Sequence, residues 1–282
     1  MKLRSLLFVP ADRPDRMEKA LGSGADALIL DLEDSIAPAK RPEARHIVAE
    51  FLARERRTSL WVRINPIDSP DAEKDIGAIL AGHPDGIVLP KAAGGASVSD
   101  LAKRLTERGN VAAMILPLAT ETPASLFRLD SYAGVKRLAG LTWGVEDLSA
   151  AVGAATAREE DGSYTEPFGL ARSLCLFGAS AAGVPAIETI YPDFRDLDGL
   201  AAYASRGRRD GFAGMLAIHP DQVPVINAAF TPSPEEVEHA RAVVNAFQAN
   251  PNAGVLALDG KMIDRPHLLL AQRILSSASA DI

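Results

Sequence analysis

Short runs of aliphatic residues recur between residues 5 and 220, and each is followed by a polar turn and a more charged stretch. The runs are almost continuously apolar, which is typical of parallel strands that lie between other layers of the protein. Eight such runs predict a closed (β/α)₈ barrel of the α/β class, a TIM barrel. They occupy Ser5–Pro10 and residues 27–32, 60–65, 86–90, 112–119, 138–145, 185–191 and 214–219.

The segments between these runs support helices that cover a barrel. Apolar residues recur at helical spacing among charged residues in 39–57, 71–80 and 98–107. The main alternative is an open doubly wound sheet, but no Gly-x-Gly-x-x-Gly follows the first run and no Gly-x-x-x-x-Gly-Lys occurs. We therefore expect a barrel over residues 1–225.

The pattern changes after Pro220. Pro232 and Pro234 interrupt the chain, residues 235–249 read as an amphipathic helix, and a turn at 250–254 precedes a last helix over about 267–278. Residues 226–282 are therefore expected to form a C-terminal helical extension.

Composition narrows the class of protein. The 282 residues are 47% hydrophobic and 24% charged, which is ordinary for a globular chain, and no apolar run is long enough to span a membrane. The apolar start is stopped by Pro10 and Asp12 without a cleavage site, so it predicts a buried strand rather than a secretory signal. A single cysteine, Cys175, excludes an internal disulfide. We expect a cytoplasmic protein.

The net charge of −7 argues against a nucleic-acid partner, since phosphate binding requires a dense face of Lys and Arg. An anionic substrate is still compatible with this charge if a local pocket is basic. Barrel enzymes place their reacting groups where the strands end. Polar residues are dense at those positions: Asp31, Glu33, Asp34, Arg63, Asn65, Lys91, Glu121, Glu146, Asp147 and His219.

Glu121 and Asp147 follow neighbouring predicted strands, so their carboxylates can converge on a hard divalent cation such as Mg²⁺. The alternative is that each caps a helix N-terminus. Arg63 ends a rigid strand, where a guanidinium can bind a carboxylate or stabilise a developing enolate oxygen. A structural salt bridge to Asp31 or Glu33 is equally consistent with its position.

Eight motifs in the same order resemble the citrate lyase β-subunit-like branch of the HpcH/HpaI aldolase superfamily, and together they cover nearly the whole chain. They are Arg-Ser-Leu-Leu-Phe-Val-Pro at residues 4–10, Asp-Leu-Glu-Asp-Ser at 31–35, Val-Arg-Ile-Asn-Pro at 62–66, Leu-Pro-Lys at 89–91, Glu-Thr-Pro at 121–123, Gly-Val-Glu-Asp at 144–147, Ile-His-Pro at 218–220 and Gly-Lys-Met-Ile-Asp at 260–264.

The resemblance implies roles for residues at the barrel mouth. Glu121 and Asp147 would bind Mg²⁺, and Arg63 would contact substrate carboxylate or carbonyl oxygens. Related lyases contact acyl-CoA through an aromatic residue in the first strand and basic residues just after it, which points to Phe8, Arg13 and Lys19. Arg13 and Lys19 are also explained as solvated helix charges.

The resemblance also implies a site built from two subunits. In the related lyases the Asp of the Met-Ile-Asp tail is the catalytic acid/base and comes from a neighbouring subunit, which assigns Asp264. The extension would then pack on or reach a neighbour in a homo-oligomer, a trimer or a hexamer. From position alone, Asp264 is a cap for the last helix. Some relatives carry a lysine where residues 214–217 are Gly-Met-Leu-Ala, so one CoA contact differs here.

The function implied is Claisen-type cleavage of a 3-hydroxyacyl-CoA of the malyl-CoA or citramalyl-CoA type. One alternative is hydrolysis of such a thioester, and another is a citrate lyase β-subunit acting on an acyl-carrier-protein thioester, or a regulatory CoA-binding protein. The superfamily's other branch cleaves free hydroxy-keto acids and carries a histidine near strand two. Asp34 stands in that tract and His46 lies on the following helix, which disfavours the branch.

Overall fold

The computed structural model describes residues 2–54 and 58–279. Within them the chain forms two compact units, one of Leu3–Asn227 and one of Lys2 with residues 228–279. The end of the predicted helix 39–57 and the last three residues of the predicted extension lie outside the described residues.

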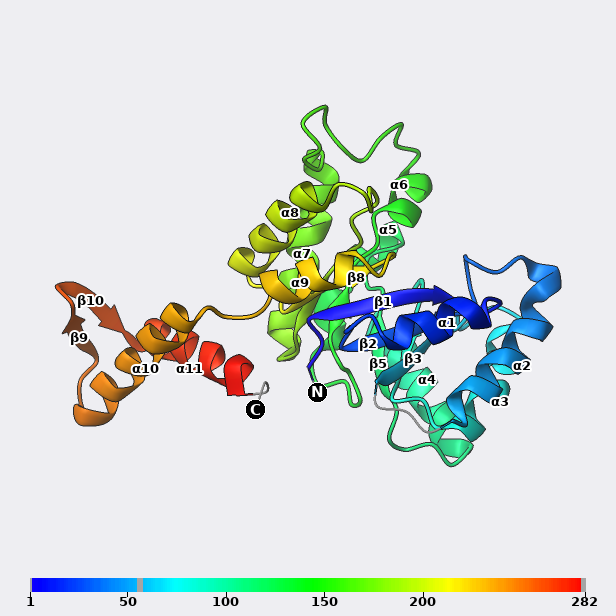
Figure 1. Ribbon diagram of the computed structural model, residues 1–282, viewed down its shortest axis with the longest axis horizontal. Coiled ribbons are helices and arrows are strands. Elements are labelled where there is room, and N and C mark those ends of the chain that lie inside the picture. The colour runs from blue at the N-terminus through cyan, green and yellow to red at the C-terminus, as the bar shows by residue number, and fades with distance from the viewer. Residues whose placement is uncertain (1, 55–57, 280–282) are drawn as a thin grey trace. The chain divides into compact units, whose positions relative to one another are not determined.

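The first unit is a barrel of eight parallel strands (Figure 1), which confirms the predicted fold class. Their order around the sheet is β5-β4-β3-β2-β1-β8-β7-β6, and single parallel bridges from Ile115 to Leu138 and from Leu118 to Thr142 close the ring between β5 and β6. The strands are β1 Ser5–Pro10, β2 Ala27–Asp31, β3 Ser59–Arg63, β4 Gly86–Leu89, β5 Met114–Pro117, β6 Leu141–Thr142, β7 Ala186–Glu188 and β8 Gly214–Ala217.

Helices follow the strands, and several carry a proline at their first or second position, which suits the first turn because proline has no N–H to leave unpaired. The helices are α1 Pro14–Leu21, α2 Arg41–Leu52, α3 Ala72–Ile79, α4 Gly95–Glu107, α5 Pro123–Leu126, α6 Glu146–Val152, α7 Glu166–Ala182, α8 Leu197–Asp210 and α9 Gln222–Ala229. Single 3₁₀ turns occupy Pro38–Lys40, Leu80–Gly82 and Leu129–Tyr132.

The barrel interior is filled by side chains from several strands, including Leu6, Ile29, Trp61 and Leu116, all fully buried. Complete burial of one such aliphatic side chain stabilises the folded state by about 1.5–3 kcal/mol. Gly86 on β4 makes room for the indole of Trp61, because a Cβ at this position would overlap the ring. The filled interior leaves the strand ends as the place for a binding site.

The C-terminal unit pairs two helices with a hairpin. It contains α10 Pro234–Ala249, β9 Val255–Leu258, β10 Lys261–Asp264 and α11 Arg265–Ser279. Its helices confirm the helical extension, but the hairpin was not predicted. The two turn residues, Asp259 and Gly260, both have positive φ, as a tight two-residue hairpin turn requires.

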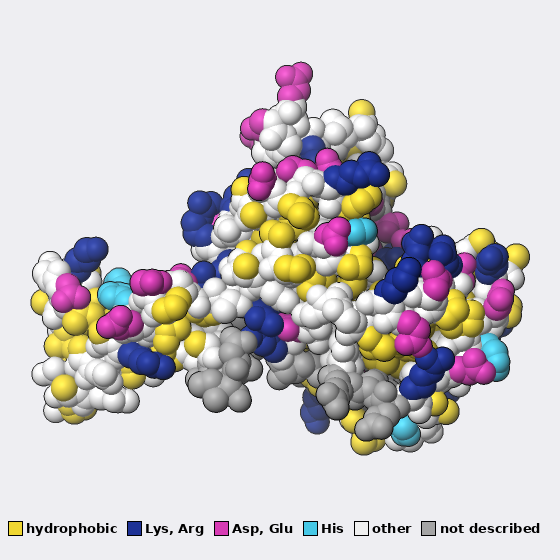
Figure 2. All heavy atoms as spheres, viewed as in Figure 1, with side chains coloured by type: hydrophobic (Ala, Val, Ile, Leu, Met, Phe, Trp, Pro, Cys, Tyr) yellow, Lys and Arg dark blue, Asp and Glu magenta, His cyan; other side chains and the backbone are white. Residues whose placement is uncertain are grey.

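Phe247 and Ile263 belong to a small core in this unit, and the capping box of Ser233 and Glu236 starts α10. Apolar and charged side chains are interspersed on its visible face (Figure 2), and Met262 exposes 61% of its surface. Across residues 2–54 and 58–279, no helix combines the length and apolar character that crossing a membrane takes.

Candidate active site

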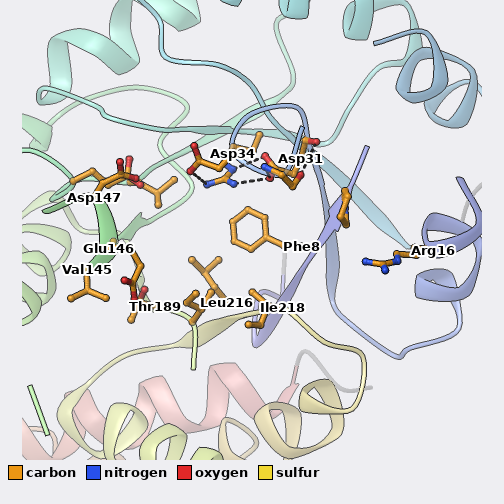
Figure 3. Close-up of a pocket in the computed structure, with 17 residues that line it drawn as sticks. Phe8, Arg16, Asp31, Asp34, Val145, Glu146, Asp147, Thr189, Leu216 and Ile218 are labelled. Atoms are coloured by element: carbon orange, nitrogen blue, oxygen red, sulfur yellow. Dashed lines mark hydrogen bonds and ion pairs between the residues drawn. The ribbon is translucent and has the colours of Figure 1, made fainter. Parts of the chain in front are cut away.

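A cavity of about 430 Å³ lies at the carboxyl ends of the barrel strands. In Figure 3, the ring of Phe8 lies between Asp31 and Asp34 on one side and Leu216 and Ile218 on the other. The cavity is lined by Phe8, Pro10, Arg16, Asp31, Asp34, Ser35, Arg63, Leu118, Glu121, Gly144, Val145, Glu146, Asp147, Thr189, Ile190, Leu216 and Ile218. It brings together four of the residues that the sequence singled out: Phe8, Arg63, Glu121 and Asp147.

Arg63 ends β3 and is held by carboxylates of the β2 end. Its Nε and Nη2 donate to the two oxygens of Asp31, both at 2.7 Å, and its Nη1 lies 3.1 Å from Oε2 of Glu33. The guanidinium also stacks over the ring of Phe8, 4.8 Å from its centroid. The two interpretations of Arg63 therefore hold together, because it forms a structural salt bridge and also lines the cavity.

The same contacts fix the charges of this group. Burial opposes the charged form of Arg63, but the pairs with Asp31 and Glu33 outweigh burial and hold its pKa above the usual value. Burial would likewise raise the pKa of Asp31, yet the guanidinium holds it below its usual range. Asp31 also accepts the main-chain N–H groups of Glu33 and Ser35, which orders the loop after β2. Arg63 is thus always charged, and its guanidinium is held in one orientation by Asp31.

Glu121 follows β5 and is buried with its carboxylate toward the cavity. Oε2 accepts the main-chain N–H of Lys91 at 2.5 Å. Gly144 gives this carboxylate its space, because a Cβ there would lie 2.9 Å from Cγ and 3.0 Å from Oε1 of Glu121. Burial raises the pKa of Glu121 to about 8; the N–H of Lys91 opposes this shift and the carboxylate of Asp147 adds to it.

Asp147 lies in the first turn of α6, with its side chain 35% exposed. Its Oδ1 is 3.4 Å from Nζ of Lys91, whose ammonium also donates to Oε1 of Glu33 at 2.7 Å. The helix caps are other residues: Val145 precedes α6, and Thr122 caps α5 by accepting the N–H of Ser125. Glu121 and Asp147 are therefore not engaged as N-caps.

The carboxylates of Glu121 and Asp147 fit a hard divalent cation whose other coordination positions are taken by water or substrate oxygens. In the part of the chain that the structure describes, no group of three or more His, Cys, Asp or Glu side chains is arranged as a metal cage. Five carboxylates line the cavity, and Asp31 is already paired with Arg63. The pair assigned by the motifs, Glu121 and Asp147, matches Mg²⁺, which is usually held by one or two protein carboxylates while water and substrate oxygens complete its shell. The space left by Gly144 supports this arrangement.

The remaining predicted residues lie elsewhere. Arg13 is exposed and pairs with Asp15, and Lys19 is exposed in the last turn of α1. Neither lines the cavity, whereas Arg16 of the same helix does. Their contact with a CoA moiety stays a prediction.

Asp264 belongs to the C-terminal unit, at the end of β10. Its Oδ1 lies 2.5 Å from Nδ1 of His267. This hydrogen bond holds the pKa of the Asp264 carboxyl below its usual range. The catalytic role of Asp264 is not tested by this contact and stays a prediction.

Three residues at or near the cavity were not singled out as site residues. Lys91 was noted at a strand end, but its main-chain hydrogen bond depends on a positive φ of 50° that the sequence does not indicate. Glu33 was considered as a partner of Arg63, and it is also the partner of Lys91. Arg16 lies one helical turn from Arg13, so the sequence alone could not decide which of the two faces the barrel mouth.

Comparisons with known proteins agree with this architecture. The family model described as HpcH/HpaI aldolase/citrate lyase matches residues 4–220, and a model described as a C–C bond lyase of the TIM-barrel fold matches residues 179–281. A citrate lyase subunit beta-like protein of Mycobacterium tuberculosis is 36% identical over 96% of this chain and 94% of its own length. A (3S)-malyl-CoA thioesterase of Cereibacter sphaeroides is 33% identical over 98% of this chain and 95% of its own length.

Among solved structures, the protein CitE from Mycobacterium tuberculosis, in complex with magnesium, acetoacetate and coenzyme A, is 33% identical to this chain. The two align with a TM-score of 0.82 over 98% of each chain.

Proposed function

This chain belongs to the HpcH/HpaI aldolase/citrate lyase family, and on that basis we propose that it is a Mg²⁺-dependent carbon–carbon lyase acting on a 3-hydroxyacyl-CoA of the malyl-CoA or citramalyl-CoA type. One observation carries the proposal. Arg63, Glu121 and Asp147 line the same cavity at the carboxyl ends of the strands, next to the ring of Phe8.

The proposed reaction breaks the bond between C2 and C3 of the acyl chain. The C3 hydroxyl becomes a carbonyl, the bonding electron pair leaves on C2 as the thioester enolate, and the hydroxyl proton is transferred, in net terms, to that carbon. The protein must therefore bind the hydroxyacid end, favour charge on the forming oxygens, and deliver a proton to C2.

Glu121 and Asp147 are the residues that would hold Mg²⁺, which supplies Lewis acidity toward the substrate hydroxyl and carboxylate when bound. Arg63 offers its remaining donor capacity to a substrate oxygen. Because Asp31 holds two of its nitrogens, little reorganisation of the guanidinium is needed during the reaction. Leu216 and Ile218 form an apolar wall that limits access of water to the enolate.

We assign the proton transfer at C2 to Asp264, supplied by a neighbouring subunit of a homo-oligomer, a trimer or a hexamer. Its lowered pKa leaves it as a carboxylate at neutral pH, the form required of a base in the condensation direction. In cleavage the same carboxylate would take up the proton that the C3 hydroxyl loses and pass it to C2. Phe8, Arg13 and Lys19 are proposed contacts of the acyl-CoA. Arg16 joins them because it is the α1 cation that lines the cavity.

A second candidate function is hydrolysis of a malyl-CoA-like thioester. It is supported by the (3S)-malyl-CoA thioesterase of Cereibacter sphaeroides, which aligns over nearly the whole chain. It would use the same cation and the same arginine, with water as the nucleophile. The third candidate, a citrate lyase β-subunit that acts on an acyl-carrier-protein thioester, shares the hydroxyacid end of the site and differs in the carrier.

One product analysis separates the three. The purified chain is incubated with Mg²⁺ and, in turn, malyl-CoA, citramalyl-CoA and methylmalyl-CoA, each racemic. A short acyl-CoA plus a keto acid identifies the lyase, and free CoA plus intact hydroxyacid identifies the thioesterase. Turnover only with an acyl-carrier-protein thioester identifies the citrate lyase subunit.

A further inference from the structure

Glu33 is a buried carboxylate that the proposed mechanism does not use. It follows the end of β2, is 3% exposed and does not line the cavity. Its Oε1 accepts from Nζ of Lys91 at 2.7 Å, and its Oε2 lies 3.1 Å from Nη1 of Arg63. Glu33 is thus shared by the lysine and the arginine of the site without reaching a ligand itself.

Lys91 stands between Glu33 and the proposed metal ligands. Its ammonium is 2.7 Å from Glu33 but 3.4 Å from Asp147, so the shorter and stronger pair is the one away from the cavity. The main chain of Lys91 is fixed as well, with a positive φ of 50° and its N–H bound to Glu121. The ammonium can therefore move only by side-chain rotation. Among the described residues, Asp147 is the other carboxylate within 4 Å of Nζ, and Glu121 lies farther away.

An ammonium that settled on Asp147 would compete directly with a divalent cation for the same oxygens. We propose that Glu33 is a positioning residue: by holding the ammonium of Lys91, it keeps Asp147 available to a divalent cation. The inference rests on the proposed metal role of Glu121 and Asp147. It adds a residue that controls cation affinity without contacting the cation, as residues behind the ligands of metal sites do.

A purely structural role for Glu33 leads to a different expectation. If Glu33 only neutralised Arg63, its loss would lower the thermal stability but leave cation binding unchanged, because Asp31 already holds Arg63 through two hydrogen bonds. If Glu33 acts through Lys91, its loss matters for cation binding only while the ammonium is present. The two roles therefore differ in a double-mutant cycle.

The test measures Mg²⁺ binding by isothermal titration calorimetry on the purified full chain at pH 8, without substrate. Four proteins are compared: the unmodified chain, Glu33→Gln, Lys91→Met and the double variant. We expect Glu33→Gln to weaken Mg²⁺ binding by about tenfold or more, as loss of an outer partner typically does. In the Lys91→Met background the same change should alter the affinity by less than about threefold.

Asp75→Asn is the matched control. Asp75 is also buried and pairs with a guanidinium, that of Arg45 at 2.6 Å, but it does not line the cavity, and no ion pair joins it to Lys91 in the part of the chain that the structure describes. Its replacement removes the same buried charge and should change Mg²⁺ affinity by less than about threefold. If Glu33→Gln does not fold, Glu33→Asp serves instead, because it keeps the charge and shortens the reach to Nζ. The expected direction is the same.

Unchanged Mg²⁺ affinity in Glu33→Gln would overturn the inference while leaving the metal site intact. An equal loss with and without Lys91 would also overturn it, since Glu33 would then act by its own charge. If the unmodified chain does not bind Mg²⁺, the proposed function fails first and this inference with it.

Discussion

Lys91 donates its main-chain N–H to Oε2 of Glu121 at 2.5 Å, across the ends of β4 and β5. The contact orients a carboxylate that is buried and whose pKa is raised by burial to about 8. A buried carboxylate with one main-chain donor has oxygen lone pairs left for a cation. The chemistry we assign to this chain depends on that arrangement.

Replacing Glu121 by Gln should reduce Mg²⁺ affinity by about 100-fold or more, because a ligand is lost together with its charge. The thermal midpoint in EDTA should hold or rise, because burial disfavours the charged form of Glu121. Calorimetry and a melting curve measure both quantities. Glu146→Gln is the control for position, since Glu146 also lines the cavity but is exposed and is not one of the two assigned ligands, so its loss should leave Mg²⁺ affinity nearly unchanged. Equal losses in the two variants would contradict the assignment of Glu121.

Mg²⁺ affinity should rise with pH up to about pH 8 and then level off. The pKa of Glu121 is raised from 4.5 to about 8, so below pH 8 a cation must displace a proton from it. Displacement of one proton corresponds to about a tenfold gain in affinity per pH unit. In the absence of a cation, the same shift lowers the stability of the fold as pH rises from 4.5 to about 8, because the unfolded carboxyl ionises first. Calorimetry at pH 6, 7, 8 and 9 tests this, and a flat profile would contradict it.

Gly144→Ala should weaken Mg²⁺ binding by about tenfold while the chain remains folded. The new Cβ would lie 2.9 Å from Cγ of Glu121, so the glutamate side chain has to move. Gly169→Ala on α7 is the control. Nothing lies within 4 Å of the Cβ that it adds, so it should stabilise the helix by about 0.5–1 kcal/mol and leave the affinity unchanged. Normal Mg²⁺ binding in Gly144→Ala would refute the role of this gap.

Arg63→Lys should lower kcat/KM for the hydroxyacyl-CoA by about 100-fold, since the charge is kept but the forked geometry is lost. Both nitrogens that pair with Asp31 depend on that geometry. Mg²⁺ affinity should change by less than about threefold. Steady-state kinetics and calorimetry on the same preparation separate the two effects. A variant with full turnover would show that Arg63 serves the fold alone.

Asp264→Ala should abolish turnover and spare Mg²⁺ and CoA binding, because Asp264 lies outside the unit that holds the cavity. Mixing it with Glu121→Gln under conditions that exchange subunits should restore part of the activity, since some sites would then combine an intact cavity with an intact Asp264. Recovery requires a shared site. If the mixed oligomers stay inactive, the two-chain arrangement is wrong.

The sequence predicted the barrel because its parallel strands are apolar on both faces, and that pattern survives without knowledge of contacts. The predicted sixth strand, residues 138–145, was too long. In the structure β6 is only Leu141–Thr142, and single bridges rather than a continuous ladder join it to the β5 side of the barrel. The hairpin of the C-terminal unit was missed although β9 is the apolar run Val-Leu-Ala-Leu, because four apolar residues do not distinguish a strand from other structure by periodicity.

At the site, residues on strand ends were predictable, and Phe8, Arg63, Glu121 and Asp147 do line one cavity. Residues whose direction depends on which face of a helix they occupy were not predictable. Arg16 is an example, because the sequence did not show that it rather than Arg13 faces the cavity. The link between Glu33 and Lys91 joins side chains 58 positions apart. It follows from the pairing of β2 with β3 and of β3 with β4, which a single sequence does not specify in register.

Cleavage in D₂O tests the central claim most directly. Malyl-CoA is incubated with the purified chain and Mg²⁺ in D₂O, and the products are identified by mass spectrometry. The account predicts acetyl-CoA with one deuterium on its methyl group, together with the oxo acid glyoxylate, and no products when EDTA replaces Mg²⁺. Free CoA with unlabelled, intact malate would contradict the lyase and establish the thioesterase instead.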